Sequence, residues 1–257
     1  MPSIFFNTAC LRLFNRHALQ RGFVGLACAV SLGPTQAQPF SGAWQVSAGW
    51  QNYSEPQMNL KGPELGLHWQ SRHLKASTLE ADVHVGLQNY SSALSGQLDS
   101  VLNVDTRWRA LRTLTTQPQW QYGLALHTHS NFLRGTTTLG FGGYDRLSTQ
   151  VWLPLRWQSV GNQPWAMDAG WLLWGEHVSR LSQVNSNLQD VTNTQRRGIY
   201  LQVSQKMSTS RSVIEPYARW TRVDVSDIRT VMIDGQIRGA YEPQNNRMNL
   251  GVKWHFR

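Results

Sequence analysis

The sequence predicts an all-β fold, an antiparallel up-and-down transmembrane β-barrel of about ten strands, with eight and twelve strands as the alternatives. Three observations support this prediction. Apolar and polar residues alternate with a period of two in successive stretches from residue 43 to the end of the chain. The connections between these stretches sort by length, and the tryptophans gather at one end of the apolar faces.

The alternating stretches have the length of strands that cross a bilayer. Most of them contain the about 9–11 residues that a tilted transmembrane strand needs, and none shows a sustained helical period. Proline is normally confined to edges and bulges, so Pro154 and Pro216 predict β-bulges inside two strands. The Asp234-Gly235 pair predicts a hairpin turn whose short arms extend the last two strands beyond the outer surface. The predicted strands are 43–53, 62–71, 77–89, 100–111, 118–130, 145–158, 164–176, 196–207, 212–223 and 245–256.

The connections alternate between short and long. If the first strand leaves the periplasm, the turns on the periplasmic side are all short, with the sequences RHLKA, TTQP, SVGNQP and STS. On the other side only SEPQMN is short, and the long connections are 90–99, 131–144, 177–195 and 224–244. Outer-membrane barrels have short periplasmic turns and long external loops, whereas an immunoglobulin-like sandwich has no reason to sort its loops by length.

The charged residues inside the strands fall on the face opposite the apolar one. An Arg or Lys against lipid costs about 2–4 kcal/mol at the bilayer midplane, so a membrane would enforce this separation. We therefore predict a lumen-lining charge network. Its members are Glu64, Glu80, Asp82, Asp105, Arg107, Arg109, Arg156, Asp168, Lys206, Glu215, Arg219 and Lys253, with Arg247 on the same face.

Large aromatic residues lie on the apolar faces, close to the ends assigned to the periplasm. In a sandwich core they would gather at mid-strand, but in a membrane barrel they ring the interface with water. The predicted interface girdle consists of Trp44, Trp69, Trp108, Trp120, Trp157, Trp165, Trp254 and Phe256.

The first 37 residues predict a secretory signal peptide. Three arginines precede an apolar run over 23–33, and small residues Thr35 and Ala37 form a cleavage site. The remaining residues, 38–257, form the predicted barrel domain in the outer membrane. Both cysteines, Cys10 and Cys28, lie in the signal, so neither a disulfide nor a thiolate metal site is expected, and no cofactor is predicted.

The composition excludes two other classes of protein. The mean hydropathy is −0.40, and outside the signal no stretch approaches the about 18 apolar residues of a membrane helix. The formal net charge is +9, but the basic residues alternate with acids and form no stripe, so nucleic-acid binding is not expected.

The final strand, MNLGVKWHF, resembles the C-terminal signature of Gram-negative outer-membrane β-barrel proteins, with the aromatic Phe256 close to the end. The usual signature ends on the aromatic, whereas here Arg257 follows it. GYDRLSTQVWLPL, DVTNTQRRG and YEPQNNRMNLG are similar to porin-like barrels of unassigned function. The resemblance implies insertion by the barrel assembly machinery and contact with outer-membrane lipids and lipopolysaccharide. The final strand should pair with the first, near Trp44 and Val46, to close the barrel.

The expected function is that of a non-enzymatic integral barrel, either a porin-like narrow channel for small polar solutes or a structural barrel. A surface-acting hydrolase of peptides or lipids is one alternative, and Asp82 and His84 are its candidate catalytic residues because Asp-Val-His resembles the Asp-x-His pair of omptin proteases. An adhesin acting through the external loops is the other. His127 and His129 share a face but lack a nearby third ligand, so no metal is expected.

Overall fold

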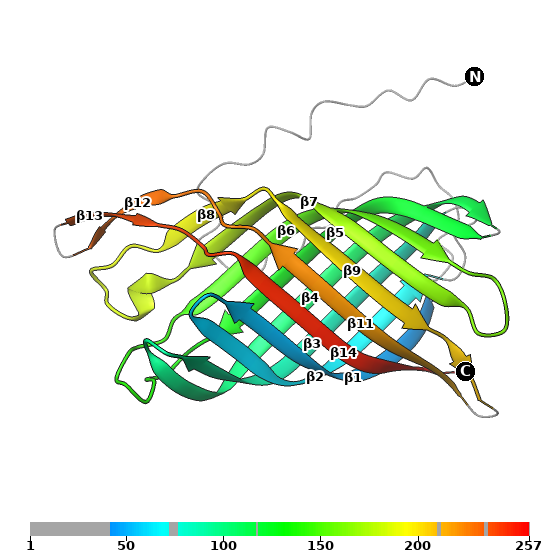
Figure 1. Cartoon of the computed structure of the whole chain (residues 1–257), viewed down its shortest axis with the longest axis horizontal. Coiled ribbons are helices and arrows are strands. Elements are labelled where there is room, and N and C mark those ends of the chain that lie inside the picture. Colours follow the sequence, from blue (N-terminus) through cyan, green and yellow to red (C-terminus); the bar gives the residue numbers. More distant parts are fainter. Residues whose placement is uncertain (1–41, 72–76, 117, 210–211, 234–235, 257) are drawn as a thin grey trace, which may run out of the picture. The chain divides into compact units, whose positions relative to one another are not determined.

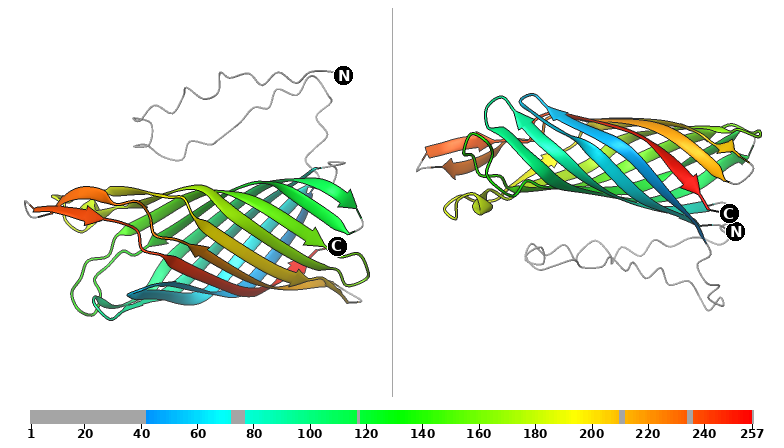
Figure 2. Two further views of the ribbon diagram at one scale, coloured as in Figure 1. Left: turned by 45° about the horizontal axis from the view of Figure 1, so that its top comes forward. Right: turned by 90° about the horizontal axis from the view of Figure 1, so that it is seen from below.

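Ten strands close into an antiparallel barrel in the part of the chain that the structure describes (Figures 1 and 2). The computed structural model describes residues 42–71, 77–116, 118–209, 212–233 and 236–256, so the predicted signal peptide lies outside it. The strands are β1 (Gly42–Glu55), β2 (Met58–Ser71), β3 (Ser77–Ser92), β4 (Gly96–Thr116), β5 (Gln119–Phe132), β6 (Asp145–Gln158), β7 (Trp165–Ser179), β8 (Val191–Gln195), β9 (Gly198–Gln205), β10 (Met207–Ser208), β11 (Val213–Val223), β12 (Arg229–Ile233), β13 (Gln236–Ala240) and β14 (Asn245–His255).

The main sheet has twelve strand segments that act as ten barrel strands. β8 and β9 pair with β7 one after the other, and β10 adds two residues beside β11. The barrel closes where β1 pairs with β14, with Val46 opposite Trp254 and Gln45 opposite His255. The predicted fold class and the predicted closing pair of strands are therefore confirmed.

The two ends of the barrel differ. The short-turn end carries the connections 72–76, 117–118, 159–164 and 209–212, together with the first and last barrel residues, Gly42 and His255. The long-loop end carries 133–144, 180–190 and 224–244, and the short 3-10 helix η3 (Leu181–Gln183) lies in the second of these. No helix in the described residues is long and apolar enough to cross a membrane.

One long connection predicted from the sequence is wrong. The range 90–99 was expected to be an external loop, but β3 continues to Ser92 and β4 begins at Gly96, leaving a three-residue turn over 93–95. Tyr90 pairs with Leu98 across this extension, and both pack against a buried cluster inside the long-loop end. Gly96 has φ +90°, which permits the tight turn.

Neither proline lies at a bulge of its own strand, so both expected bulges are wrong. Pro154 pairs with Gly170 on β7, and its pairing with β5 stops at Leu155–Tyr122 and resumes in the same register at Trp152–Ala125. The register shift between Val151 and Trp152 leaves Leu173 without a partner, so the nearby bulge lies in the neighbouring strand β7. The same kind of interruption occurs at Pro216. Pairing between β11 and its neighbour stops at Tyr217–Ser204 and resumes in the same register at Ile214–Met207. Because proline has no N–H to donate, the ladder is interrupted there without an extra residue.

The two arms of the predicted hairpin form a separate two-stranded sheet, in which β12 pairs with β13, while the predicted turn residues Asp234 and Gly235 lie outside the described residues. This sheet projects beyond the long-loop end of the barrel (Figure 1). The side-chain amide of Asn193, in the middle of β8, donates hydrogen bonds to the carbonyls of Asp227 and Ala240, which flank the two arms of this hairpin.

The outer surface of the barrel is apolar. Among the predicted girdle residues, Trp44, Trp108, Trp120, Trp165, Trp254 and Phe256 are exposed, whereas Trp69 and Trp157 are half-buried beside their register partners Trp44 and Trp120. Leucines and valines at mid-strand are exposed as well, including Leu65, Leu87, Leu124 and Val85. Polar groups thus fill the inside of this molecule and apolar groups cover the outside, the reverse of a soluble protein.

Candidate functional site: the charged interior of the barrel

The side chains of the predicted charge network all point into the barrel. Glu64, Asp82, Asp168 and their neighbours on the same strand faces are buried because successive residues of a strand point to opposite sides. The buried members are Glu64, Glu80, Asp82, Asp105, Arg109, Asp168, Glu215, Arg219 and Lys253, and the half-buried ones are Arg107, Arg156, Lys206 and Arg247.

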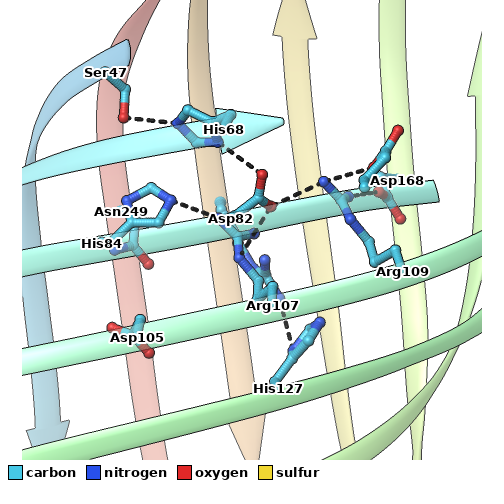
Figure 3. Close-up of polar contacts among 12 residues, drawn as sticks. Ser47, His68, Asp82, His84, Asp105, Arg107, Arg109, His127, Asp168 and Asn249 are labelled. Atoms are coloured by element: carbon cyan, nitrogen blue, oxygen red, sulfur yellow. Dashed lines mark hydrogen bonds and ion pairs between the residues drawn. The ribbon is translucent and has the colours of Figure 1, made fainter. Parts of the chain in front are cut away.

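Two arginines and three carboxylates form the densest part of the interior. Arg109 on β4 donates through Nη2 to Glu80 (2.8 Å) and Asp82 (3.0 Å) on β3, and through Nη1 to Asp168 (2.9 Å) on β7. Arg156 on β6 donates to Glu80 Oε1 (2.6 Å) and to Asp168 Oδ2 (3.0 Å). Figure 3 shows Arg109 between Asp82 and Asp168. Two of these ion pairs, Arg109 to Asp168 and Arg156 to Glu80, join strands that are not neighbours in the sheet, so they cross the lumen.

Further contacts cross the lumen nearer the long-loop end. Arg247 on β14 lies 2.5 Å from Asp105 on β4, and Asp105 also accepts a hydrogen bond from Nδ1 of His129 at 2.8 Å. Asn249 on β14 donates to both carboxylate oxygens of Glu64 on β2, at 3.1 and 3.0 Å. Each of these contacts removes open space from the interior.

An aromatic plug of Trp152, Tyr200 and His127, capped by Arg219, fills the middle of the barrel. Trp152 has no exposed surface, and its ring centroid lies 5.6 Å from that of His127 and 5.4 Å from that of Tyr200. The Arg219 guanidinium lies 4.4 Å from the Tyr200 ring centroid. Buried Leu172 also packs against the plug, because it shares the inward face of β7 with Asp168; after the bulge at Leu173 the inward positions shift by one residue, to Gly175 and His177.

Sequence reasoning missed Trp152, although a signal was present. Trp152 lies four residues before Arg156 on the same strand, so the alternation that turned Arg156 inward also turned Trp152 inward. Its inward orientation was missed because Trp152 is large and apolar and most other tryptophans lie on the outer faces.

The candidate catalytic pair is not brought together. His84 Nε2 faces Arg107 at 3.0 Å, and its Nδ1 lies 3.7 Å from Glu64. The imidazole that contacts Asp82 belongs to His68, at 2.8 Å, because His68 and Asp82 are direct partners across β2 and β3. In the described residues no group of three or more His, Cys, Asp or Glu side chains could hold a metal ion.

A cavity remains inside the short-turn end. It is lined by residues beside the short turns, such as Gln70, Gln158 and Lys206, and by buried Lys253 and Glu215. The space open to water is about 70 Å³. One water needs at least about 10–15 Å³ by this measure, so the cavity holds roughly five waters or a very small solute.

The mouth cluster, formed by the buried side chains of Arg146, Glu55, Glu242 and His177, lies inside the long-loop end. Arg146 on β6 donates through Nη2 to Glu55 at 2.5 Å and also pairs with Glu242, which belongs to the connection 224–244. His177 Nε2 lies 3.1 Å from the second Glu242 oxygen. Within the same connection, the hydroxyl oxygen of Ser226 accepts a hydrogen bond from the backbone N–H of Glu242 at 2.8 Å, which joins its two halves. The sequence offered no signal for this cluster, because its two acids, Glu55 and Glu242, lie outside the predicted strands.

We expect the mouth cluster to loosen as the pH rises. Burial raises the pKa of Glu242 to about 8 from 4.5, with the Glu55 carboxylate adding to the rise and Arg146 opposing it. A group with a raised pKa in the folded state stabilises that state at low pH, and the contribution is lost as the pH rises from 4.5 through about 8. A spin label on Ile237→Cys in the β12–β13 hairpin should therefore become more mobile over this range.

Glu242→Gln provides the control for this pH effect. The amide stays uncharged at every pH, so the mobility of the same spin label should no longer change between acid and mildly alkaline solution. The only cysteines of the chain, Cys10 and Cys28, fall in the predicted signal peptide, so the label has no competing thiol after cleavage. An identical pH profile in the two proteins would contradict the role of Glu242.

Comparison with known proteins gives a fold-level likeness only. No protein-family model matches the chain, and no curated protein does. Among solved structures, the translocator domain of the autotransporter NalP from Neisseria meningitidis is similar at 10% identity, over 86% of this chain and 90% of that chain, with a TM-score of 0.46. An outer membrane channel from Pseudomonas putida F1 is similar at 12% identity, over 88% and 100% of the two chains, with a TM-score of 0.40.

The β domain of the Bordetella autotransporter BrkA is similar at 13% identity, over 84% of this chain and 98% of that chain, with a TM-score of 0.40. At these values the function of this chain has to be inferred from its own residues.

Proposed function

We propose that this chain is an integral outer-membrane β-barrel protein with a closed interior, a structural barrel rather than a narrow porin-like channel. The observation that carries the proposal is the inverted distribution of side chains. Leu65 is 69% exposed on the outer surface, while its neighbour Glu64 is 3% exposed inside the barrel. Such an arrangement is stable only where the outer surface meets lipid.

The closed interior is supported by the contacts that cross it. The ion pairs of Arg109 and Arg156 span from β3 and β4 to β6 and β7, and the aromatic plug around Trp152 fills the middle. A barrel of about ten strands has an interior that side chains can fill, with room for little more than a small ligand. The structural role is therefore favoured over free passage of solutes.

The orientation, location and partners belong to the same proposal. The exposed aromatics beside the short turns, including Trp44 and Phe256, support placing that end at the periplasmic interface. Outer-membrane lipids and lipopolysaccharide would then surround the barrel. The predicted signal peptide and the alternating last strand support export and insertion by the barrel assembly machinery.

Leu65→Arg tests the membrane location. A guanidinium at mid-strand on a lipid-facing surface should cost about 2–4 kcal/mol of stability in vesicles. Leu139→Arg is the matched control, because Leu139 is a leucine of similar exposure, 61%, in the connection 133–144. The free energy of unfolding in urea, measured in lipid vesicles, should fall for Leu65→Arg and change little for Leu139→Arg. Equal effects, or a protein that stays soluble without detergent, would refute the proposal.

Recordings in planar bilayers test the closed interior. The wild-type protein should show no sustained single-channel conductance across a range of salts and voltages. A stable conductance would mean that the interior of the barrel opens in the membrane. It would refute the proposed structural role and show that the protein is a channel.

A further inference from the structure

Ser47, His68 and Asp82 form a hydrogen-bonded chain across three adjacent strands. The His68 imidazole lies between the other two, with Nδ1 2.8 Å from Asp82 Oδ1 and Nε2 2.9 Å from Ser47 Oγ (Figure 3). All three residues are 3% exposed. Ser47 also hydrogen-bonds to Tyr217 on β11, so its hydroxyl lies where the His68 chain meets the polar network of the interior.

The strand register produces this arrangement. His68 on β2 is directly opposite Asp82 on β3, and Ser47 on β1 is opposite Gly66, two residues before His68 and on the same face. A Cβ on Gly66 would lie 2.3 Å from Ser47 Oγ, so the glycine leaves the space that the hydroxyl needs to reach the imidazole.

The neighbours of Asp82 fix the positions of the protons. Arg109 Nη2 lies 3.0 Å and Arg107 Nε 3.5 Å from Asp82 Oδ2, so the carboxylate is held as an anion by two guanidinium groups. An anionic Asp82 accepts from His68 Nδ1–H, which leaves Nε2 as the acceptor for the Ser47 hydroxyl proton. This is the tautomer that a Ser-His-Asp triad requires.

We propose that Ser47 is a nucleophile activated by His68 as general base, with Asp82 orienting the imidazole, and that it acts on small carboxylic esters entering from the short-turn end. This activity goes beyond the proposed structural role. His68 lines the cavity at that end together with Gln45 and Lys253. The small volume of the cavity limits the acyl group to about the size of acetyl.

Lys253 supplies a cation on the same side. It is the register partner of Ser47 on β14, and its side chain is buried in the interior and lines the cavity. A fixed positive charge stabilises the oxyanion that forms when a carbonyl is attacked. The four side chains thus provide a nucleophile, a base, an orienting carboxylate and an electrophilic group.

The reaction balances without any group outside the protein other than water. The Ser47 hydroxyl proton moves to His68 Nε2 while Oγ forms a bond to the ester carbonyl carbon, whose π electrons move to oxygen. The intermediate collapses, the carbon–alkoxide bond breaks, and the leaving alkoxide takes the proton from Nε2. Water then attacks the acyl-Ser47 in the same way and releases the carboxylic acid.

A second serine–histidine pair in the barrel lacks this arrangement. Ser148 Oγ lies 2.7 Å from His177 Nδ1, and Glu242 is on the Nε2 side at 3.1 Å, so the ring is reversed relative to the triad. The Glu242 carboxyl carries a proton over much of the pH range and cannot fix the tautomer in the same way. Ser148 therefore provides a matched control inside the same barrel.

Labelling with methanesulfonyl fluoride tests the proposal. Attack by Ser47 Oγ forms an oxygen–sulfur bond, expels fluoride and passes the hydroxyl proton to His68. The adduct is located by mass spectrometry of peptides from folded protein in detergent. We expect labelling of Ser47 and none of Ser148, no adduct at position 47 in Ser47→Ala, and a labelling rate at least about 100-fold lower in His68→Gln. Ser148→Ala should be labelled like the wild type.

Heat-modifiable gel migration shows which variants are folded. If His68→Gln does not fold, the heat-unfolded wild-type protein replaces it, and Ser47 should lose its selective labelling there. Absence of the adduct at Ser47 in the folded wild type, or an unchanged rate in a folded His68→Gln, would overturn the proposal. A conducting barrel with labelled Ser47 would contradict only the closed interior and leave the nucleophile in place.

Discussion

Arg109→Ala should lower the stability of the barrel more than any other single change in the charge network. Arg109 neutralises Glu80, Asp82 and Asp168 at distances of 2.8–3.0 Å, and its removal leaves three buried carboxylates with fewer cations. Removing one partner of a buried ion pair typically costs about 3–5 kcal/mol because the remaining charge is left uncompensated. The free energy of unfolding in urea, measured in lipid vesicles, should fall by about this amount.

Arg112→Ala is the control for this prediction. Arg112 lies three residues further along β4 and is exposed, so its loss removes an arginine from the same strand without uncovering a buried acid. Its stability should stay within about 0.5 kcal/mol of the wild type, as for most surface substitutions. A similar loss in both variants would mean that the interior ion pairs contribute little.

Trp152→Ala should both destabilise the barrel and open a path through it. The indole has no exposed surface and packs against the rings of both His127 and Tyr200, so its truncation creates a cavity in the middle of the lumen. Large-to-small changes of this kind cost about 3–5 kcal/mol. The variant should show single-channel conductance in planar bilayers under conditions in which the wild type shows none.

Trp171→Ala is the control, because it removes a tryptophan from the outer surface instead of the lumen. Trp171 lies on the neighbouring strand β7 but is 51% exposed on the outside of the barrel, so its removal leaves the interior filled. Conductance in this variant, or a closed Trp152→Ala barrel that is folded by gel migration, would show that the aromatic plug is not the barrier.

The architecture could be predicted from the sequence because the alternation of side chains along a strand, with a period of two, determines which face each residue occupies. Alternation assigned Arg109, Arg156 and Asp168 to one face and Leu65 to the other without knowledge of any contact. The loop lengths gave the two ends, and the closing pair near Val46 and Trp254 followed from the alternation in the last strand.

Partners across the barrel could not be predicted in the same way. Arg109 reaches Asp168 because β4 and β7 face one another once the sheet closes, and this depends on the stagger between strands. The partner of Asp82 depends on the register between β2 and β3. This register places His68 of β2 directly opposite Asp82, whereas His84, two residues after Asp82 on β3, makes other contacts. The bulge at Leu173 changed the facing of β7 and had no signal in composition.

The closure of β1 on β14 also has a consequence for the order of folding. These two strands come from opposite ends of the described chain, and the barrel has no complete interior until they pair. Contacts such as Arg247 to Asp105 and Asn249 to Glu64 join the last strand to the earliest ones, so they form only at that moment. Non-local pairing of this kind folds slowly. The pairing of β1 with β14 should therefore set the rate of assembly. Until it occurs, charged side chains such as Asp105 and Glu64 lack the partners that β14 supplies.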